Sequence, residues 1–297
     1  MQTISEIRTV LESAGLSPRK RYGQCFLHDH HYMQSLLELA DVPPGAAVLE
    51  VGPGTGSLTE ELLDRADRVV AAEIDRGLSA VLRKRFAGRE DFTLIEGDVL
   101  AGKHELAPEV TRHLSGQVHM VSNLPYNIAT PLISQCLIDT WRRMVAGACG
   151  LVAFERLTFT VQREVAERLI APPGGGAYGI VSVLVALLAD AKAGPVLPPT
   201  AFWPRPKVDS QMLRIDFDPA AAERIPDIDR LCEVLALAMG QRRKKLSSVA
   251  KRRGSPIASA DMGEAIARVG VNPDARSGEI TPGEYARLAR AVSEIKG

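Results

Sequence analysis

The stretch VLEVGPGTGSLTEELL, residues 48–63, decides the fold of this chain. It begins as a buried β-strand, turns on the closely spaced Gly52, Gly54 and Gly56, and continues with the apolar periodicity of a helix. Glycine allows a sharp turn and lets the backbone approach a ligand closely. This unit therefore predicts the start of an α/β sheet with a ligand-binding loop, although a plain strand-to-helix turn would have the same pattern.

The same alternation continues on both sides of this stretch. Strands are predicted at 47–51, 68–74, 92–95, 118–121, 158–161 and 212–217, and helices at 58–63, 77–86, 130–137 and 163–170. Strands that alternate with helices predict a Rossmann-like α/β fold, with a parallel sheet covered on both faces. Asp218-Pro219 breaks this pattern, and the residues beyond have helical periodicity. We therefore expect a catalytic domain at residues 1–217 and a small all-helical domain at 218–297.

Acidic residues follow the next two predicted strands. Glu73 lies about 20 residues beyond Gly52, the spacing at which an acid accepts hydrogen bonds from the ribose hydroxyls of an adenosine. Asp75 competes for this role, but it is better placed to cap the following helix. Asp98 ends the third strand and could accept a hydrogen bond from an adenine amino group. Together the strand ends predict an adenosine-binding crevice.

The glycine spacing alone does not distinguish NAD from S-adenosylmethionine (SAM). A pyrophosphate-binding loop prefers a third glycine where this chain has Ser57, which disfavours NAD. We expect Ser57 to cap the helix instead, with Glu60 completing a capping box.

The fourth strand is followed by SNLPYNIATP, residues 122–131, which must face the same crevice. The side-chain oxygen of Asn123 and a nearby backbone carbonyl can both accept hydrogen bonds from one exocyclic amine. Pro125 stiffens the loop, and Tyr126 offers a flat face for an extruded base. Two acceptors on an aromatic amine free its lone pair, which suits methyl transfer by positioning and preorganised electrostatics.

Composition restricts the class of protein. The 297 residues are 45% hydrophobic, with 36 basic and 36 acidic side chains. Residues 218–297 have a small basic excess and residues 1–217 a matching acidic one, so nucleic-acid binding would depend on local patches. The cysteines lack CxxC spacing, and the apolar run 179–191 is too short to span a bilayer. We expect a soluble, cytoplasmic monomer.

Two other clusters of polar residues are candidate binding sites, for RNA and for a metal ion. The run QRRKKLSSVAKRR, residues 241–253, includes Arg242, Arg243, Lys244 and Lys245 and no acid, so it could contact RNA phosphates or form a solvated helix face. A smaller basic patch lies at residues 19–21. The histidines of HDHHY, residues 28–32, are too close together to share one tetrahedral metal ion easily, so we expect a polar helix start and no metal.

Several motifs resemble the adenine-N6 dimethyltransferases of small-subunit ribosomal RNA, the kasugamycin-sensitivity family. The similarity covers nearly the whole chain in family order. Its motifs are RKRYGQCFL (19–27), GPGTGSLT (52–59), AEID (72–75), NLPYNIATPLI (123–133), VQREVAERL (161–169), YGIVSVLV (178–185), AFWPRPKVDS (201–210), MGQRRKKL (239–246) and VGVNPDARSGEITPGEYARLA (269–289). Each motif alone is weak evidence, whereas the ordered series is specific.

The resemblance implies SAM as the donor and two adjacent adenosines near the 3′ end of small-subunit rRNA as acceptors, within an immature small subunit. It implies that Asn123, Leu124, Pro125 and Tyr126 hold the target adenine and that Phe202 covers its other face. The SAM site would be lined by Cys25, Leu27, Gly52, Gly54, Glu73, Asp98 and Asn123.

Two departures from the family pattern are relevant. Cys25 stands where the family usually has Asn or His, and a thiol is a poorer hydrogen-bonding group, although a backbone contact at Leu27 would remain. The segment 138–156 also looks longer than usual.

Other functions remain possible at this point. They are a macrolide-resistance methyltransferase of large-subunit rRNA, a ribosome-assembly factor without essential methylation, a DNA adenine methyltransferase, and an NAD enzyme. The motifs at 201–210 and 269–289 favour the small-subunit enzyme.

Overall fold

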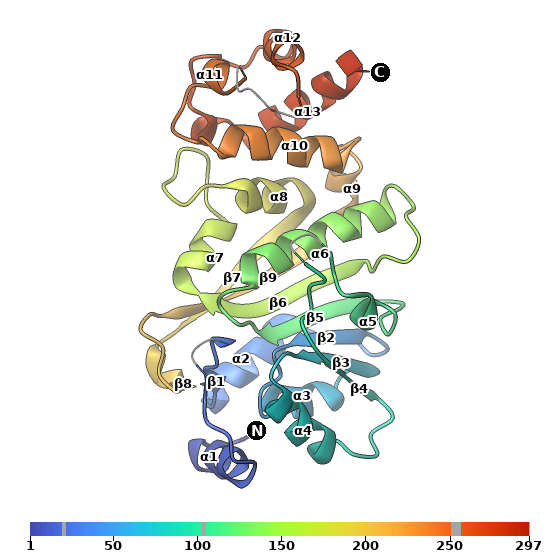
Figure 1. Ribbon diagram of the computed structural model, residues 1–297, viewed down its shortest axis with the longest axis vertical. Helices are drawn as coiled ribbons and strands as arrows, with labels where there is room; N and C mark the ends of the chain where they lie inside the picture. Colours follow the sequence, from blue (N-terminus) through green and yellow to red (C-terminus); the bar gives the residue numbers. More distant parts are fainter. Residues whose placement is uncertain (20–21, 103–104, 251–256, 297) are drawn as a thin grey trace.

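The computed structural model describes residues 1–19, 22–102, 105–250 and 257–296 (Figure 1). In these residues, seven strands form one sheet with the order β4-β3-β2-β5-β6-β9-β7. Their bounds, in that order, are Phe92–Glu96, Arg68–Glu73, Ala47–Val51, Val118–Asn123, Phe154–Gln162, Ser210–Phe217 and Ala189–Leu197. The strands from β4 to β6 are parallel, whereas β9 pairs antiparallel with both β6 and β7. The predicted α/β sheet is confirmed, with an antiparallel pair added at one edge.

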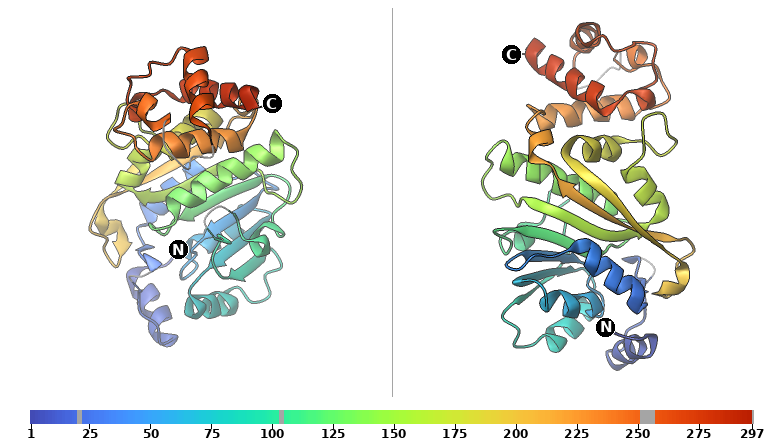
Figure 2. Two further views of the ribbon diagram at one scale, coloured as in Figure 1. Left: turned by 45° about the horizontal axis from the view of Figure 1, so that its top comes forward. Right: turned by 180° about the vertical axis from the view of Figure 1, so that it is seen from behind.

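Helices cover both faces of the sheet. The helices are α2 (His30–Ala40), α3 (Ser57–Leu63) and α4 (Arg76–Arg85) on one face, and α5 (Pro108–Thr111) and α6 (Ala129–Met144) on the other. Leu49 and Val51 belong to the core under α6, whereas Val48 belongs to the core under α2 and α3. Figure 2, seen from behind, shows α2 lying across the strands. Burial on both faces explains why β2 is almost continuously apolar.

The edge of the sheet differs from the predicted pattern. The apolar run 179–191 contains a helix, α8 (Ile180–Leu188), that passes directly into strand β7. A separate two-stranded antiparallel ribbon pairs β1 (Phe26–Leu27) with β8 (Phe202–Trp203), which follows the short helix η2 (Pro199–Ala201). No helix in the described part of the chain is long and apolar enough to cross a membrane.

Caps determine where several helices begin. Asp29 caps α2 by accepting hydrogen bonds from the backbone N–H groups of His31 and Tyr32, so HDHHY is the predicted polar helix start. The prediction that Ser57 caps α3 is wrong. Gly56 occupies the cap position, and the Ser57 hydroxyl donates to Gln2 Oε1 at 2.7 Å. Ser57 is the first residue of α3, so its side chain bonds to the N-terminal segment and α3 has no side-chain cap.

The other helices lie before the first sheet strand, between β6 and β7, and after β9. These helices are α1 (Ile4–Ser13), α7 (Arg163–Leu169), α9 (Pro219–Ala222), α10 (Ile228–Met239), α11 (Leu246–Ala250), α12 (Ser259–Val269), η3 (Ser277–Glu279) and α13 (Pro282–Lys296). The C-terminal helices share one hydrophobic core with α6 and α8. Trp141 Nε1 donates to the Ala222 carbonyl at 3.0 Å, and the Tyr178 hydroxyl donates to the Ile280 carbonyl at 2.9 Å. The division at residue 217 stays a prediction.

Candidate active site

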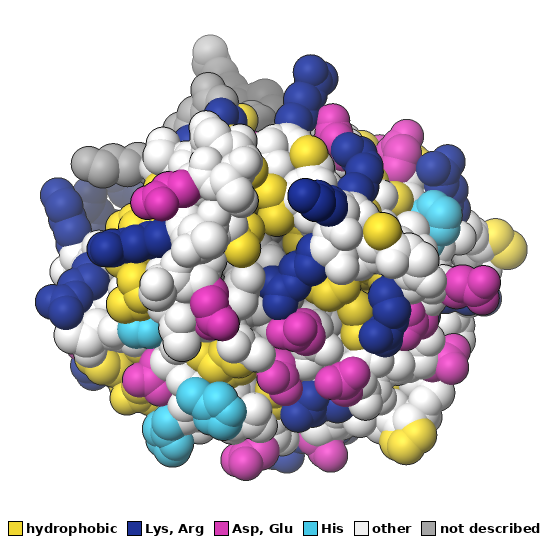
Figure 3. Space-filling model, turned by 90° about the horizontal axis from the view of Figure 1, so that it is seen from below, with side chains coloured by type: hydrophobic (Ala, Val, Ile, Leu, Met, Phe, Trp, Pro, Cys, Tyr) yellow, Lys and Arg dark blue, Asp and Glu magenta, His cyan; other side chains and the backbone are white. Residues whose placement is uncertain are grey.

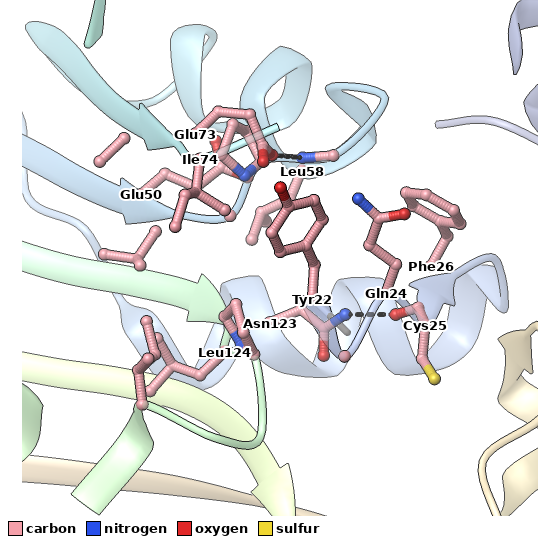
Figure 4. Close-up of a pocket in the computed structure, with 18 of the residues that line it drawn as sticks. Tyr22, Gln24, Cys25, Phe26, Glu50, Leu58, Glu73, Ile74, Asn123 and Leu124 are labelled. Atoms are coloured by element: carbon pink, nitrogen blue, oxygen red, sulfur yellow. Dashed lines mark hydrogen bonds between the residues drawn. The ribbon is translucent and has the colours of Figure 1, made fainter. Parts of the chain in front are cut away.

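A cavity lies at the carboxyl ends of β2, β3, β4 and β5, where parallel α/β sheets bind ligands. The chain segment 22–27 closes its remaining side (Figure 4). This cavity brings together all but one of the predicted catalytic and donor-binding residues. They are Cys25, Leu27, Gly52, Gly54, Glu73, Asp98, Asn123, Leu124, Pro125 and Tyr126.

The glycine loop after β2 is tightly packed as well as sharply turned. Gly52 and Gly54 have φ angles of +69° and +63°, which are strained for any other L-residue. A Cβ on Gly52 would lie 3.0 Å from the Pro125 ring, and one on Gly54 would lie 2.8 Å from the Phe26 ring. The glycines therefore let this loop meet both the segment 22–27 and the loop after β5.

Glu73 supplies a buried acceptor at the tip of β3. Its Oε2 accepts from the Gly54 N–H at 3.1 Å, and its Oε1 accepts from the Asp75 N–H at 2.8 Å. The side chain is 4% exposed, and burial raises the pKa of Glu73 to about 7 despite these hydrogen bonds. Each oxygen keeps a lone pair for a further donor.

Asp75 has the helix-capping role that the sequence predicts for it. It caps α4 through the Gly77 N–H at 2.9 Å, and it pairs with Arg19 at 3.2 Å. Its Oδ2 also accepts from Gln24 Nε2. Asp75 thus holds the segment before β1 against the start of α4, and it does not line the cavity.

Asp98 lies on the exposed rim of the cavity, after β4. Its Oδ1 accepts from the Leu100 N–H at 3.0 Å, which orients the side chain. The hydrogen bonds of the described residues leave the second carboxylate oxygen available to a ligand. Ile74, 46% exposed, lines the cavity between the tips of β3 and β4 and offers an apolar contact.

Asn123 is oriented by a contact with the opposite wall. Its Nδ2 donates to the Cys25 carbonyl at 2.9 Å, as Figure 4 shows. In the described residues no donor reaches its Oδ1, so the amide keeps an acceptor for another molecule. The contact also shows what Cys25 contributes, because its carbonyl performs this role and its side chain does not.

The Cys25 thiol itself points away from Asn123 (Figure 4). It packs against apolar residues of the α2 core, and burial raises the pKa of the thiol. The adjacent Leu27 is 4% exposed and lies in the β1–β8 ribbon. A thiol is compatible with this arrangement because the backbone makes the polar contact.

The rest of the loop after β5 is fixed on several sides. The Leu124 N–H donates to the Thr160 carbonyl at 3.1 Å, and Pro125 packs on Gly52. The Tyr126 hydroxyl and Ser210 Oγ share a hydrogen bond of 2.9 Å, and burial raises the pKa of Tyr126. The loop is therefore held by β6, β9 and the glycine turn.

Phe202 is the predicted residue that does not join the site. It is 1% exposed, belongs to the core beneath α2, and does not line the cavity. Because β8 pairs with β1, Phe202 lies opposite Leu27 in this ribbon and supports it. The structure therefore places Phe202 outside the cavity, and a contact between Phe202 and a base stays a prediction.

Three further residues that the sequence pattern did not indicate also line the cavity. Tyr22 and Gln24 reach the cavity from the segment before β1, and Glu50 lies at its base. The only signal for Glu50 was an acid in an otherwise apolar strand. Tyr22 and Gln24 come from a segment without regular structure, so no periodicity indicated their direction.

The predicted RNA-contacting residues lie at the other end of the molecule, between α10 and α11 (Figure 1). Arg243 and Lys244 are exposed, and Lys245 pairs with Asp274 at 2.9 Å. Arg242 instead donates to the carbonyls of Gly175 and Tyr178 at 3.0 and 3.1 Å, so its role here is structural. Residues 20–21 and 251–253 of the basic runs lie outside the described residues.

At the cavity end of the molecule, acidic and basic side chains are interspersed and form no continuous basic face (Figure 3). Chemically, the cavity combines a buried carboxylate, a rim carboxylate and an oriented amide oxygen at successive strand ends. These groups can bind a nucleoside and hold an amine beside it, and none of the described cavity residues is arranged as an activated nucleophile.

Comparisons with known proteins agree with this arrangement. The family described as Ribosomal RNA adenine dimethylase matches residues 15–294. The protein named Ribosomal RNA small subunit methyltransferase A from Phenylobacterium zucineum (strain HLK1) is 36% identical over 293 residues, covering 98% of this chain and 94% of the relative. A protein of the same name from Synechococcus sp. (strain JA-2-3B'a(2-13)) is 39% identical over 283 residues, covering 93% of each.

A solved structure shares the fold. The crystal structure of a dimethyladenosine transferase from Plasmodium falciparum gives a TM-score of 0.67 at 21% identity, covering 89% of this chain and 95% of that chain.

Proposed function

This chain belongs to the ribosomal RNA adenine dimethylase family, and from that premise we propose that it dimethylates N6 of two adjacent adenosines near the 3′ end of small-subunit rRNA, with SAM as methyl donor. The observation that carries the proposal is the oriented amide of Asn123, whose Oδ1 is left free by the contact of Nδ2 with Cys25.

The cavity residues fit SAM. The remaining lone pairs of Glu73 accept the ribose hydroxyls, and the second oxygen of Asp98 accepts the adenine amino group. Ile74 packs on the adenine, and the backbone of Leu27 lies at the opposite end of the cavity. When bound, SAM supplies an electrophilic methyl group.

The loop after β5 holds the target adenine. Asn123 Oδ1 and the Leu124 carbonyl each accept one hydrogen of the exocyclic amine, which favours a pyramidal nitrogen with a free lone pair. Tyr126 stacks on the base, and its bond to Ser210 fixes the ring. The nitrogen loses its proton after alkylation, when that proton has become acidic, so no strong base is required.

Residues 1–217 perform this chemistry, and residues 218–297 contribute to contact with an immature small subunit. Among the described residues of the basic run, Arg243 and Lys244 are exposed and can reach phosphates, whereas Arg242 binds backbone carbonyls and Lys245 pairs with Asp274. The near-neutral surface favours recognition of subunit shape over nonspecific RNA binding by a monomer.

The test is methyl transfer from labelled SAM to small subunits that lack the adenosine dimethylation. Naked small-subunit rRNA and large subunits are the controls. We expect label only in small-subunit rRNA from assembled particles. Transfer to large subunits alone would instead favour a macrolide-resistance activity, and tight subunit binding without transfer would favour an assembly factor.

A further inference from the structure

A second cavity lies at the opposite end of the sheet from the candidate active site. It opens at the amino ends of the parallel strands β5 and β6 and at the carboxyl end of β9, which runs antiparallel to β6. The segment 138–156, which looks longer than the family pattern, supplies Met144, Glu155 and Arg156 to its wall. The proposed function uses none of these residues.

His119 is a buried histidine in the wall of the second cavity. It is 2% exposed, and its Nδ1 is buried without a hydrogen-bonding partner among the described residues. Burial and the nearby Arg156 lower the pKa of His119, and Glu155 opposes them, so the imidazole is neutral near pH 7. A buried polar atom without a partner costs free energy, which a hydrogen bond from a ligand would recover.

Two arginines in the same wall keep part of their hydrogen-bonding capacity. The Nε atoms of Arg156 and Arg214 donate to Asp216 at 2.6 and 2.7 Å. Their Nη1 atoms donate to backbone carbonyls at the end of α2. Within the described part of the chain no hydrogen bond uses Nη2 of either arginine, so each guanidinium group keeps donors for a ligand.

Glu155 supplies an acceptor beside these donors. It is the extra residue of a β-bulge, because two consecutive residues of β5 pair with Phe154 and Arg156 of β6. Bulges turn a side chain in a new direction and are frequent at binding sites. The Glu155 Oε2 atom accepts from Gln117 Nε2 at 2.6 Å, and the hydrogen bonds of the described residues leave Oε1 available.

The charges around the second cavity nearly balance. Its wall contains two arginines and the three carboxylates of Asp41, Glu155 and Asp216. Asp216 pairs with both arginines, and Asp41 Oδ2 lies 3.4 Å from Arg156 and 3.7 Å from Arg214. A phosphate would meet the carboxylates, and an ammonium group would meet the guanidinium groups. The cavity therefore favours a neutral ligand that has both donors and acceptors.

A guanine base has this combination of groups. Its O6 and N7 accept, which suits arginine, whereas its N1–H and 2-amino group donate, which suits a carboxylate. Proteins that bind unpaired RNA bases contact these edges and pack the flat face on apolar or guanidinium surfaces. Met144, 47% exposed, and the half-buried Phe217 provide apolar surface in the second cavity.

We propose that the second cavity is a binding site for a guanine base. The Nη2 groups of Arg156 and Arg214 donate to O6 and N7, and Glu155 and His119 accept from N1–H and the 2-amino group. The base belongs either to an unpaired RNA nucleotide or to a free guanine nucleoside.

The imidazole nitrogens of His119 report on this site by NMR of the full chain, and His119→Phe identifies their signals. The probes are guanosine, inosine, which lacks only the 2-amino group, and adenosine. We expect guanosine to shift the His119 signals and inosine to bind about tenfold more weakly, the effect of one lost hydrogen bond to a charged group. Adenosine should leave these signals in place. Asn123→Ala, in the candidate active site, should not change the response to guanosine.

Two variants separate binding from folding. Glu155→Gln keeps an acceptor for Gln117 but loses the carboxylate, so calorimetry should show guanosine binding weakened by about tenfold. His119→Phe should abolish measurable guanosine binding. Its thermal midpoint should not fall, because an apolar ring replaces a polar ring whose buried Nδ1 has no partner.

The RNA pentamers UUGUU and UUAUU identify the source of the base. Tighter binding of UUGUU than of guanosine, with no His119 shift from UUAUU, would assign the site to an unpaired RNA nucleotide. Weaker binding of UUGUU than of guanosine would assign it to a free nucleoside. The proposal is overturned if no guanine probe shifts the His119 signals at millimolar concentration, if adenosine binds as well as guanosine, or if His119→Phe keeps the wild-type affinity.

Discussion

Asn123 has two hydrogen-bonding groups, and substitution can separate them. Asn123→Ala removes both, and we expect methyl transfer to fall by about 10²- to 10³-fold, the usual effect of deleting one preorganised polar group. Asn123→Asp keeps an acceptor but loses the donor to the Cys25 carbonyl, so it should retain partial activity. Single-turnover rates on small subunits measure both effects. Subunit binding should be unchanged, and full activity in Asn123→Ala would disprove the positioning role.

Glu73 should make nucleoside binding depend on pH. Its pKa of about 7 means that the carboxyl is protonated below that pH and offers one acceptor fewer to the ribose. Methylthioadenosine affinity should therefore fall as pH drops from 8 to 6, by up to about tenfold per unit below the pKa. Glu73→Gln should bind weakly, with a flat profile over the same range. A flat wild-type profile would contradict this role for Glu73.

The residue types predicted the chemistry of the site better than they predicted which way each side chain points. Asn123, Glu73 and Asp98 were found because parallel strands place their tips together. The sequence pattern did not show that the Phe202 side chain is buried or that Arg242 binds two backbone carbonyls. Glu50 was overlooked because an acid within a strand has no local signature of a cavity.

At the scale of elements, the turn between β2 and α3 is the most constrained. Gly54→Ala combines a left-handed φ with a Cβ 2.8 Å from the Phe26 ring, so we expect a loss of about 2–4 kcal/mol in unfolding free energy. Gly15→Ala is the matched control, with a similar φ of +66° and open space around the added Cβ. It should cost only about 1 kcal/mol. Chemical denaturation would show equal losses if packing against Phe26 were unimportant.

Periodicity predicted the parallel strands and their helices because buried strands and amphipathic helices have distinct apolar patterns. It did not separate α8 from β7, because the apolar run 179–191 contains α8 and continues into the start of β7. The β1–β8 ribbon was also missed, since two-residue strands have no period. The N-cap of α3 is Gly56, and the Ser57 hydroxyl bonds instead to Gln2, which is distant in the sequence. Contacts between residues that are distant in the sequence thus determined each of these elements.

At the scale of the whole molecule, one hydrophobic core extends across the predicted domain boundary. A fragment of residues 1–217 would expose the α6 and α8 surfaces that the C-terminal helices cover. It would also lose the acceptors of Trp141 and Tyr178. We therefore expect this fragment to bind a hydrophobic dye and to unfold without a cooperative transition. Cooperative unfolding like that of the full chain would show instead that residues 1–217 fold independently.

The residues of the basic run should have two different functions, phosphate contact and structural support. Replacing Arg243 and Lys244 with alanine should weaken small-subunit binding and reduce its salt dependence, without changing the thermal midpoint. Arg242→Ala should lower the thermal midpoint, because the carbonyls of Gly175 and Tyr178 lose their donor. Filter binding at several salt concentrations, together with thermal unfolding, measures both. Unchanged affinity in the Arg243 and Lys244 variant would show that this surface is only solvated.

We propose that the cavity at the ends of β2 to β5 delivers methyl groups to adenine N6 in small-subunit rRNA. The most direct measurement is nucleoside mass spectrometry with sequence mapping, after wild-type or Asn123→Ala protein has acted on undimethylated small subunits with SAM. With wild-type protein we expect N6,N6-dimethyladenosine at two adjacent positions near the 3′ end of small-subunit rRNA. With Asn123→Ala we expect essentially none. Methylation at another base or atom, or an equal yield from Asn123→Ala, would contradict it.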